Sequence, residues 1–218
     1  MKTKAFSLLD LVIVIAVAGV LAFFLLPPSR GPHTKAPRIH CVNNLKQVGL
    51  AFRVWAADHG ERMPNQVPAI EGGSMETLLA GDLVAAFRNL SNELSTPNIL
   101  HCPSDADSVS VRSFLDFGDE NASYFLSADA STSNPEALLA GDRNITNGTR
   151  LVAGLLNVSS NAPAGWNHKI HEKAGNVAFA DGSVQQLTIN GLKQVTTTQP
   201  DPTRLALPRA NRQPMDPL

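Results

Sequence analysis

Two histidines and one aspartate in the last third of the sequence carry side chains that can bind a metal ion. His168, His171 and Asp181 offer imidazole and carboxylate ligands, which suit zinc or manganese. A metal site needs three or four ligands that converge on one point, and sequence spacing does not establish convergence. The alternative is a structural role, in which His171 forms hydrogen bonds near a turn. We favour the structural role and therefore predict no metal and no other cofactor.

The two cysteines are the only nucleophilic thiols of the chain. No activating pattern of charged residues surrounds Cys41 or Cys102, so neither is predicted to be catalytic. Two other interpretations remain, a pair of buried free thiols and one disulfide. Phosphate-binding loops, nucleophile elbows and paired catalytic acids are absent from the sequence. The sequence therefore predicts a protein that is not an enzyme.

An apolar segment lies near the start of the sequence. Residues 6–26 contain a single charged side chain, that of Asp10. As a helix these residues would extend roughly 32 Å, compared with about 30 Å for the hydrocarbon core of a bilayer. We therefore expect a transmembrane helix over residues 6–26. A buried core helix and a cleaved secretory signal that follows Lys2 and Lys4 are the alternatives, but the segment lacks a polar face and a small-residue cleavage site.

Asp10 needs a partner, because a carboxylate within an apolar helix is unfavourable by about 2.5–3.5 kcal/mol at the centre of a bilayer. If the chain were cut between Ala5 and Phe6, the new α-amino group of Phe6 would be a cation. Asp10 of a neighbouring copy could then neutralise it. This hypothesis links one acidic side chain to proteolytic processing and to assembly.

The segment Lys-Thr-Lys-Ala-Phe-Ser-Leu-Leu-Asp, residues 2–10, resembles the leader of type IV pilins and type II secretion pseudopilins. In this family the residue before the cut is usually Gly, where this chain has Ala5, and the acid is usually Glu, where it has Asp10. The resemblance implies that residues 1–5 are a leader that a prepilin peptidase removes. It also implies N-methylation of Phe6 and a role for Asp10 in subunit assembly.

Three further motifs resemble a pilin-like subfamily and occur in its order. They are Cys-Val-Asn-Asn-Leu-Lys-Gln-Val-Gly-Leu-Ala at residues 41–51, Cys-Pro-Ser-Asp at 102–105, and His171 separated by nine residues from Asp181-Gly182, an H-X9-DG region. With the leader, they extend the resemblance over about residues 1–190. Since such a domain would lie in an oxidising compartment, we predict a Cys41–Cys102 disulfide.

The remaining pattern predicts the domain that carries these motifs. Residues 27–38, with four prolines and one glycine by residue 37, are expected to form a stem that interrupts the helix. A helix is predicted over 38–59 and one or two short helices over 74–94. Strands are predicted over 122–126, 138–140 and 151–158, and a hairpin over 175–187 with Asp181-Gly182 at its turn.

These predictions give an α+β fold class. After the transmembrane helix, residues 39–196 would form a pilin-like extracytoplasmic domain in which a helix packs on a small antiparallel sheet. Residues 197–218 contain five prolines and no periodicity, so we expect a disordered tail.

Composition argues against nucleic-acid binding, because the net charge is −1 and the isoelectric point is about 6.6. The resemblance implies a structural or assembly subunit of a type II secretion pseudopilus or pilus-like fibre. Its partners would be prepilin peptidase, other pilin-like subunits and the membrane. It would be a single-pass protein of the bacterial inner membrane, with its carboxy-terminal domain in the periplasm or outside the cell. The alternatives are a membrane-tethered extracytoplasmic module that binds a ligand such as a glycan or peptide, and a tethered hydrolase.

Overall fold

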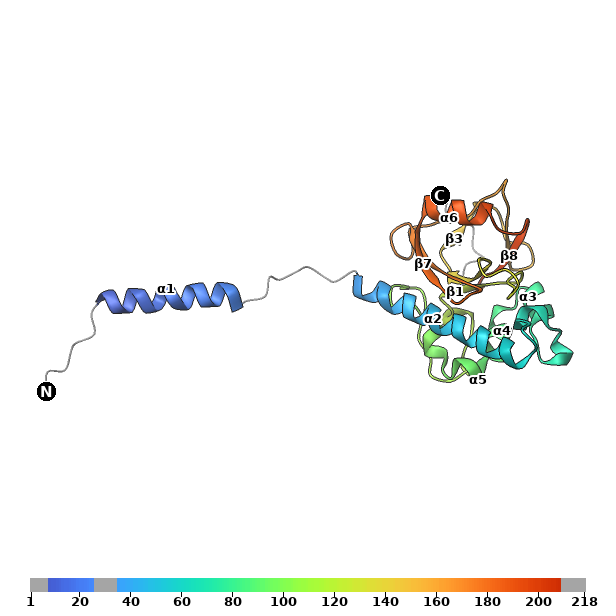
Figure 1. The fold of residues 1–218 in the computed structure, drawn as a ribbon, viewed down its shortest axis with the longest axis horizontal. Coiled ribbons are helices and arrows are strands. Elements are labelled where there is room, and N and C mark those ends of the chain that lie inside the picture. The colour runs from blue at the N-terminus through green and yellow to red at the C-terminus, as the bar shows by residue number, and fades with distance from the viewer. Residues whose placement is uncertain (1–7, 26–34, 209–218) are drawn as a thin grey trace. The chain divides into compact units, whose positions relative to one another are not determined.

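The computed structural model describes residues 8–25 and 35–208 (Figure 1). The chain divides into two compact units, Met1–His33 and Thr34–Leu218. The described part of the first unit is one helix, α1 (Leu8–Leu25). The second unit contains every other described element.

The prediction of a transmembrane helix over residues 6–26 is wrong. The described helix α1 has 18 residues, and a helix of this length extends about 27 Å, which is less than the bilayer core of about 30 Å. Among the residues that the structure describes, no helix is both long and apolar enough to cross a membrane.

The helices of the second unit precede most of its strands. The longest is α2 (Lys35–Asp58), followed by α3 (Met75–Leu79), α4 (Leu83–Asn89) and α5 (Ser91–Leu94), while α6 (Ile189–Thr197) lies later in the chain. Short 3₁₀ turns are η1 (Pro64–Gln66), η2 (Ala69–Glu71), η3 (Pro97–Leu100) and η4 (Asp119–Asn121). Helix α2 begins inside the predicted stem, because Pro37 lies in its first turn, where no backbone N–H needs an intrahelical acceptor.

Six antiparallel strands form the main sheet. They are β1 (Tyr124–Ser127), β2 (Leu138–Asp142), β4 (Leu155–Val158), β6 (Ala174–Phe179), β7 (Val184–Thr188) and β8 (Thr203–Ala206), in the order β4-β8-β1-β2-β6-β7. A second sheet pairs β3 (Ile145–Thr146) with β5 (Gly165–Trp166). The second unit therefore has an α+β architecture with a sheet that is larger than the sequence indicated.

Strand β8 corrects the prediction of a disordered tail over residues 197–218. It lies inside the sheet, between β4 and β1, and Leu205 and Ala206 are fully buried. The tail lacks helical periodicity because this part of it is a four-residue strand, which is too short to show a pattern. Residues 209–218 lie outside the described residues.

The main sheet has a hydrophobic core on each face. Tyr124 and Leu126 of β1 belong to the core that also contains the buried face of α2, whereas Phe125 between them belongs to the core with Leu192 of α6. This alternation follows from the two-residue period of a strand. Helix α2 also contacts β2, β6 and β7, so a long helix lies against the sheet, and α6 lies on its other side (Figure 1).

Candidate functional site

The residues predicted for leader cleavage cannot be placed. Ala5 and Phe6 lie outside the described residues, and the structure therefore leaves cleavage and N-methylation as predictions. Asp10 lies within α1, but its side chain is also outside the described part of the chain.

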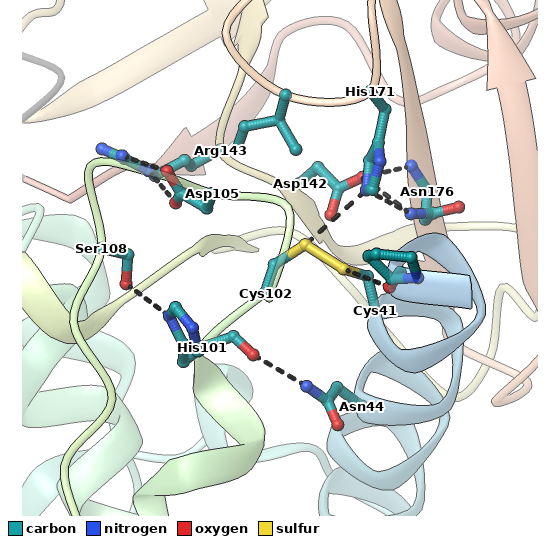
Figure 2. The surroundings of a disulfide bond; sticks show 12 residues. Cys41, Asn44, His101, Cys102, Asp105, Ser108, Asp142, Arg143, His171 and Asn176 are labelled. Carbon is teal, nitrogen blue, oxygen red and sulfur yellow. Dashed lines mark hydrogen bonds and ion pairs between the residues drawn. A yellow bond between two sulfur atoms is a disulfide. The ribbon is translucent and has the colours of Figure 1, made fainter. Parts of the chain in front are cut away.

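The predicted disulfide is present between Cys41 and Cys102 (Figure 2). It joins the first half of α2 to the segment that follows η3, across 61 residues of chain. Both cysteines are fully buried. The disulfide is the centre of a buried polar cluster, which also contains His171, Asp142 and Asn176 (Figure 2).

An unusual turn brings His171 to the disulfide. His171, Glu172 and Lys173 all have positive φ angles, of 56°, 53° and 63°, a conformation that is unfavourable for residues other than glycine. Hydrogen bonds from neighbouring elements hold the turn. The Arg38 guanidinium of α2 donates to the His171 carbonyl at 2.6 Å, and the Asn144 side chain donates to the carbonyls of Ile170 and Ala174. Strained backbone that is held by several contacts is typical of functional sites.

The His171 side chain is 3% exposed and directs its Nε2 atom into the cluster. Nε2 lies 3.6 Å from the Cys102 sulfur and 3.4 Å from Asp142 Oδ2. Burial, and then the positive charge of Arg38, lower the pKa of His171 to about 4. The imidazole is therefore neutral at neutral pH and retains a lone pair.

Asp142 at the end of β2 is fully buried. Its Oδ2 atom accepts hydrogen bonds from the backbone N–H of Asn176 at 2.7 Å and from the Asn176 side chain at 2.9 Å. Its Oδ1 atom has no hydrogen-bond partner. Burial raises the pKa of Asp142 to about 7, although the Asn176 hydrogen bonds and Arg38 act in the opposite direction.

A second buried carboxylate lies beside this cluster (Figure 2). Asp105, from the Cys-Pro-Ser-Asp motif, accepts two hydrogen bonds from Arg143, from Nε at 2.5 Å and from Nη2 at 2.6 Å. Arg143 does not pair with its neighbour Asp142, because consecutive residues of an extended segment point in opposite directions.

The H-X9-DG region contacts α2 at two points. Arg38 donates to the His171 carbonyl, and Arg53 donates to the Asp181 carbonyl at 2.6 Å. The two arginines are about four helical turns apart on one helix and lie on the same side of it. Strand β6 lies between His171 and Asp181, and it packs against α2. The region therefore holds α2 along the sheet through backbone carbonyls, a role that sequence reasoning missed because neither arginine lies in a motif.

As predicted, Asp181-Gly182 lies at the turn of a hairpin, which strands β6 and β7 form. Gly182 has a φ angle of 84°, and the Asp181 carboxylate accepts a hydrogen bond from the Ser183 N–H at 2.7 Å. A Cβ atom on Gly49 of α2 would lie 3.3 Å from the Gly182 Cα atom. Glycine at both positions thus allows the helix to approach the turn closely.

A cavity of about 320 Å³ lies beside this turn. Its polar lining comes from Arg53, Glu61, Thr132 and Asp181, and alanines and Pro135 complete it. This volume is at the lower end of the range for small-molecule sites. The cavity can therefore accept a small polar ligand.

The structure does not bring His168, His171 and Asp181 together as a metal site. His168 is exposed, and the Asp181 carboxylate bonds within its own turn. Within residues 8–25 and 35–208, the group with metal-ligand spacing is Cys41, Cys102 and His171, whose ligand atoms lie within 4.8 Å of one another. Sequence reasoning named all three residues but did not combine them.

Comparison with known proteins gives no further assignment, since no family model, no curated protein and no solved structure matches this chain.

Proposed function

We propose that this protein is a structural subunit that assembles with other copies, or with related pilin-like subunits, through helix α1. The observation that carries the proposal is the exposed apolar surface of α1. Its consecutive residues Leu11, Val12, Ile13, Val14 and Ile15 are 53–63% exposed. Five consecutive helical positions point in all directions around the axis, so the helix has no polar face for water.

A helix that is apolar all round is normally buried inside a larger structure. Within the first unit these side chains are exposed, and packing against equivalent helices would remove them from water. A buried leucine or isoleucine contributes about 1.5–3 kcal/mol. Several such residues per helix would supply a large driving force for assembly.

The leader resemblance supplies the route to assembly. Cleavage between Ala5 and Phe6 by a prepilin peptidase would create an α-amino group, and Asp10 of a neighbouring subunit would pair with it. The Cys41–Cys102 disulfide supports a position of the second unit outside the cytoplasm, because disulfides persist in oxidising compartments.

The first test is the mass of the amino-terminal peptide from native cells with and without prepilin peptidase. The proposal expects N-methylated Phe6 only when the peptidase is present. An intact Met1 in both strains would contradict processing.

The second test compares two glutamate substitutions in the full-length chain by sedimentation and chemical cross-linking. Ile15→Glu should reduce assembly strongly, because it places a charge in the packed helix. Ile70→Glu is the matched control, since Ile70 is 95% exposed but belongs to the second unit. Asp10→Ala should also lose assembly. Normal assembly of both Ile15→Glu and Asp10→Ala would contradict the proposal.

The cavity beside Arg53 favours a second candidate function, an extracytoplasmic module that binds a glycan or peptide. This candidate expects saturable binding to a glycan or peptide array by a chain that remains monomeric. Arg53→Ala should abolish that binding, because it removes the main cation of the cavity. Binding that survives this substitution would rule the cavity out as the ligand site.

A further inference from the structure

Three potential metal ligands meet at the disulfide and a fourth, Asp142, lies beside His171, each from a different segment (Figure 2). Cys41 comes from α2, Cys102 from the segment after η3, His171 from the left-handed turn and Asp142 from the end of β2. The sulfur atoms and the His171 Nε2 atom lie within 4.8 Å of one another. Two thiolates, an imidazole and a carboxylate form a ligand set that zinc prefers.

The distances already present match a zinc tetrahedron. With Zn–N and Zn–O bonds of about 2.0–2.2 Å and Zn–S bonds of about 2.3 Å, the tetrahedron has edges of roughly 3.4 Å between N and O and roughly 3.6 Å between N and S. His171 Nε2 lies 3.4 Å from Asp142 Oδ2 and 3.6 Å from Cys102 Sγ. Two edges are therefore formed before any metal binds.

The burial of the cluster provides a second and independent argument. Asp142 is completely buried. The negative charge of a buried carboxylate is unfavourable unless a cation compensates it. Zn²⁺ with two thiolates and one carboxylate has a net charge of −1, and the Arg38 guanidinium that binds the His171 carbonyl would balance it.

Groups around the cluster already hold the ligands in place. Asn176 fixes the Asp142 carboxylate through two hydrogen bonds, and Arg38 and Asn144 fix the turn that carries His171. Metal sites depend on such supporting contacts to orient their ligands. In a zinc tetrahedron the two sulfur atoms would separate to roughly 3.8 Å, and the Asn176 side-chain nitrogen, which lies 3.2 Å from His171 Nε2, would have to release that atom.

We propose that reduction of the Cys41–Cys102 disulfide converts this cluster into a tetrahedral zinc site formed by Cys41, Cys102, His171 and Asp142. A dithiol supplies two electrons and two protons, which break the S–S bond and yield two thiols, while the dithiol becomes a disulfide. Zn²⁺ then displaces the two thiol protons and binds both thiolates. The chain thus has two alternative cross-links between α2 and the rest of the fold, a disulfide under oxidising conditions and zinc under reducing conditions.

The test uses the full-length chain, reduced under anaerobic conditions with a phosphine, which does not compete for the metal as a dithiol would. Co²⁺ is the probe, because thiolate-to-cobalt charge transfer and intense d–d absorption report tetrahedral coordination. We expect one equivalent of Co²⁺ to bind and one equivalent of Zn²⁺ to displace it. The oxidised chain should bind neither.

Variants separate this site from a cysteine pair in an unfolded chain. His171→Ala and Asp142→Asn should each weaken zinc binding by more than about tenfold, while the exposed His168→Ala serves as the matched control and should not change it. Circular dichroism of each oxidised variant checks its fold. The absence of binding to the reduced chain, equal binding by the oxidised chain, or wild-type affinity in both His171→Ala and Asp142→Asn would overturn the proposal.

Discussion

Asp105 and Asp142 are two buried aspartates beside the same disulfide, and they differ in what neutralises them. Asp105 faces the Arg143 guanidinium and accepts two short hydrogen bonds from it. Asp142 faces the Asn176 amide groups and a neutral imidazole, and one of its oxygens has no partner. Burial alone therefore does not determine how the charge of a carboxylate is neutralised. The first aspartate stabilises the fold, whereas the second is suited to binding a proton or a cation.

The largest effect is expected when the paired aspartate loses its charge. Asp105→Asn should lower the free energy of unfolding by about 3–5 kcal/mol, because it breaks a buried ion pair. Urea denaturation measures the change. Asp107→Asn is the matched control, since this residue lies 3.7 Å from the same arginine with a side chain that is 61% exposed, and exposed pairs contribute about 0–1 kcal/mol. Equal losses of unfolding free energy in Asp105→Asn and Asp107→Asn would contradict a special role for the buried ion pair.

The same substitution at the other aspartate should have the opposite sign. Burial raises the pKa of Asp142 to about 7. At pH 8, which is above this value, the carboxylate is still ionised in the folded chain. Asp142→Asn avoids this unfavourable ionisation and should raise the free energy of unfolding of the oxidised chain by about 2–4 kcal/mol. Urea denaturation at pH 8 measures the change, and a loss of stability would contradict the conclusion that the ionised Asp142 carboxylate is unfavourable in the folded chain.

The pH dependence of stability separates the Asp142 and His171 contributions. Asp142 has a raised folded pKa, so between about pH 4 and 7 the folded chain holds a proton that the unfolded chain releases, and stability falls as pH rises. His171 has a lowered folded pKa, so between about pH 4 and 6.5 the unfolded chain holds the extra proton, and stability rises with pH. The two contributions oppose each other.

When one of the two residues is replaced, the change of unfolding free energy with pH should therefore show the contribution of the other residue alone. In the oxidised chain, Asp142→Asn should become more stable from pH 4 to 6.5, and His171→Gln should become less stable from pH 4 to 7. The slopes approach about 1.4 kcal/mol per pH unit. Thermal or urea unfolding across this range measures them, and slopes of the same sign in both variants would contradict the assignment.

The smallest effect concerns Arg38, whose positive charge lowers the pKa values of both Asp142 and His171. Arg38→Gln should raise both pKa values by less than about one unit, as expected for one nearby charge. Nuclear magnetic resonance titration of the two side chains measures this. Arg53→Gln is the matched control, because Arg53 also binds a backbone carbonyl from α2 but lies at the other end of β6. A similar shift in both variants would mean that Arg38 has no specific effect.

Local features of the sequence were predictable, and contacts between distant segments were not. The hairpin around Asp181-Gly182 and the helix α2 have strong local patterns. The disulfide was predicted from the two cysteines together with the oxidising compartment that the family resemblance implies. The Arg143–Asp105 pair joins residues 38 positions apart, and Arg38 reaches across 133 positions to His171. Nothing in their local sequence indicates a partner. The transmembrane prediction failed because an apolar composition alone does not establish a helix that is long enough to cross a membrane.

The position of β8 has a consequence for how the protein is made. This strand is the last of the sheet to be synthesised, yet it is the only strand in the described residues that links β4 to the others. Until residues 203–206 join the sheet, β1 presents an open edge, and β4 has no strand to pair with. Open strand edges recruit other chains. A chain that ends before β8 should therefore be prone to aggregation, and the sheet is completed from its interior rather than from its margin.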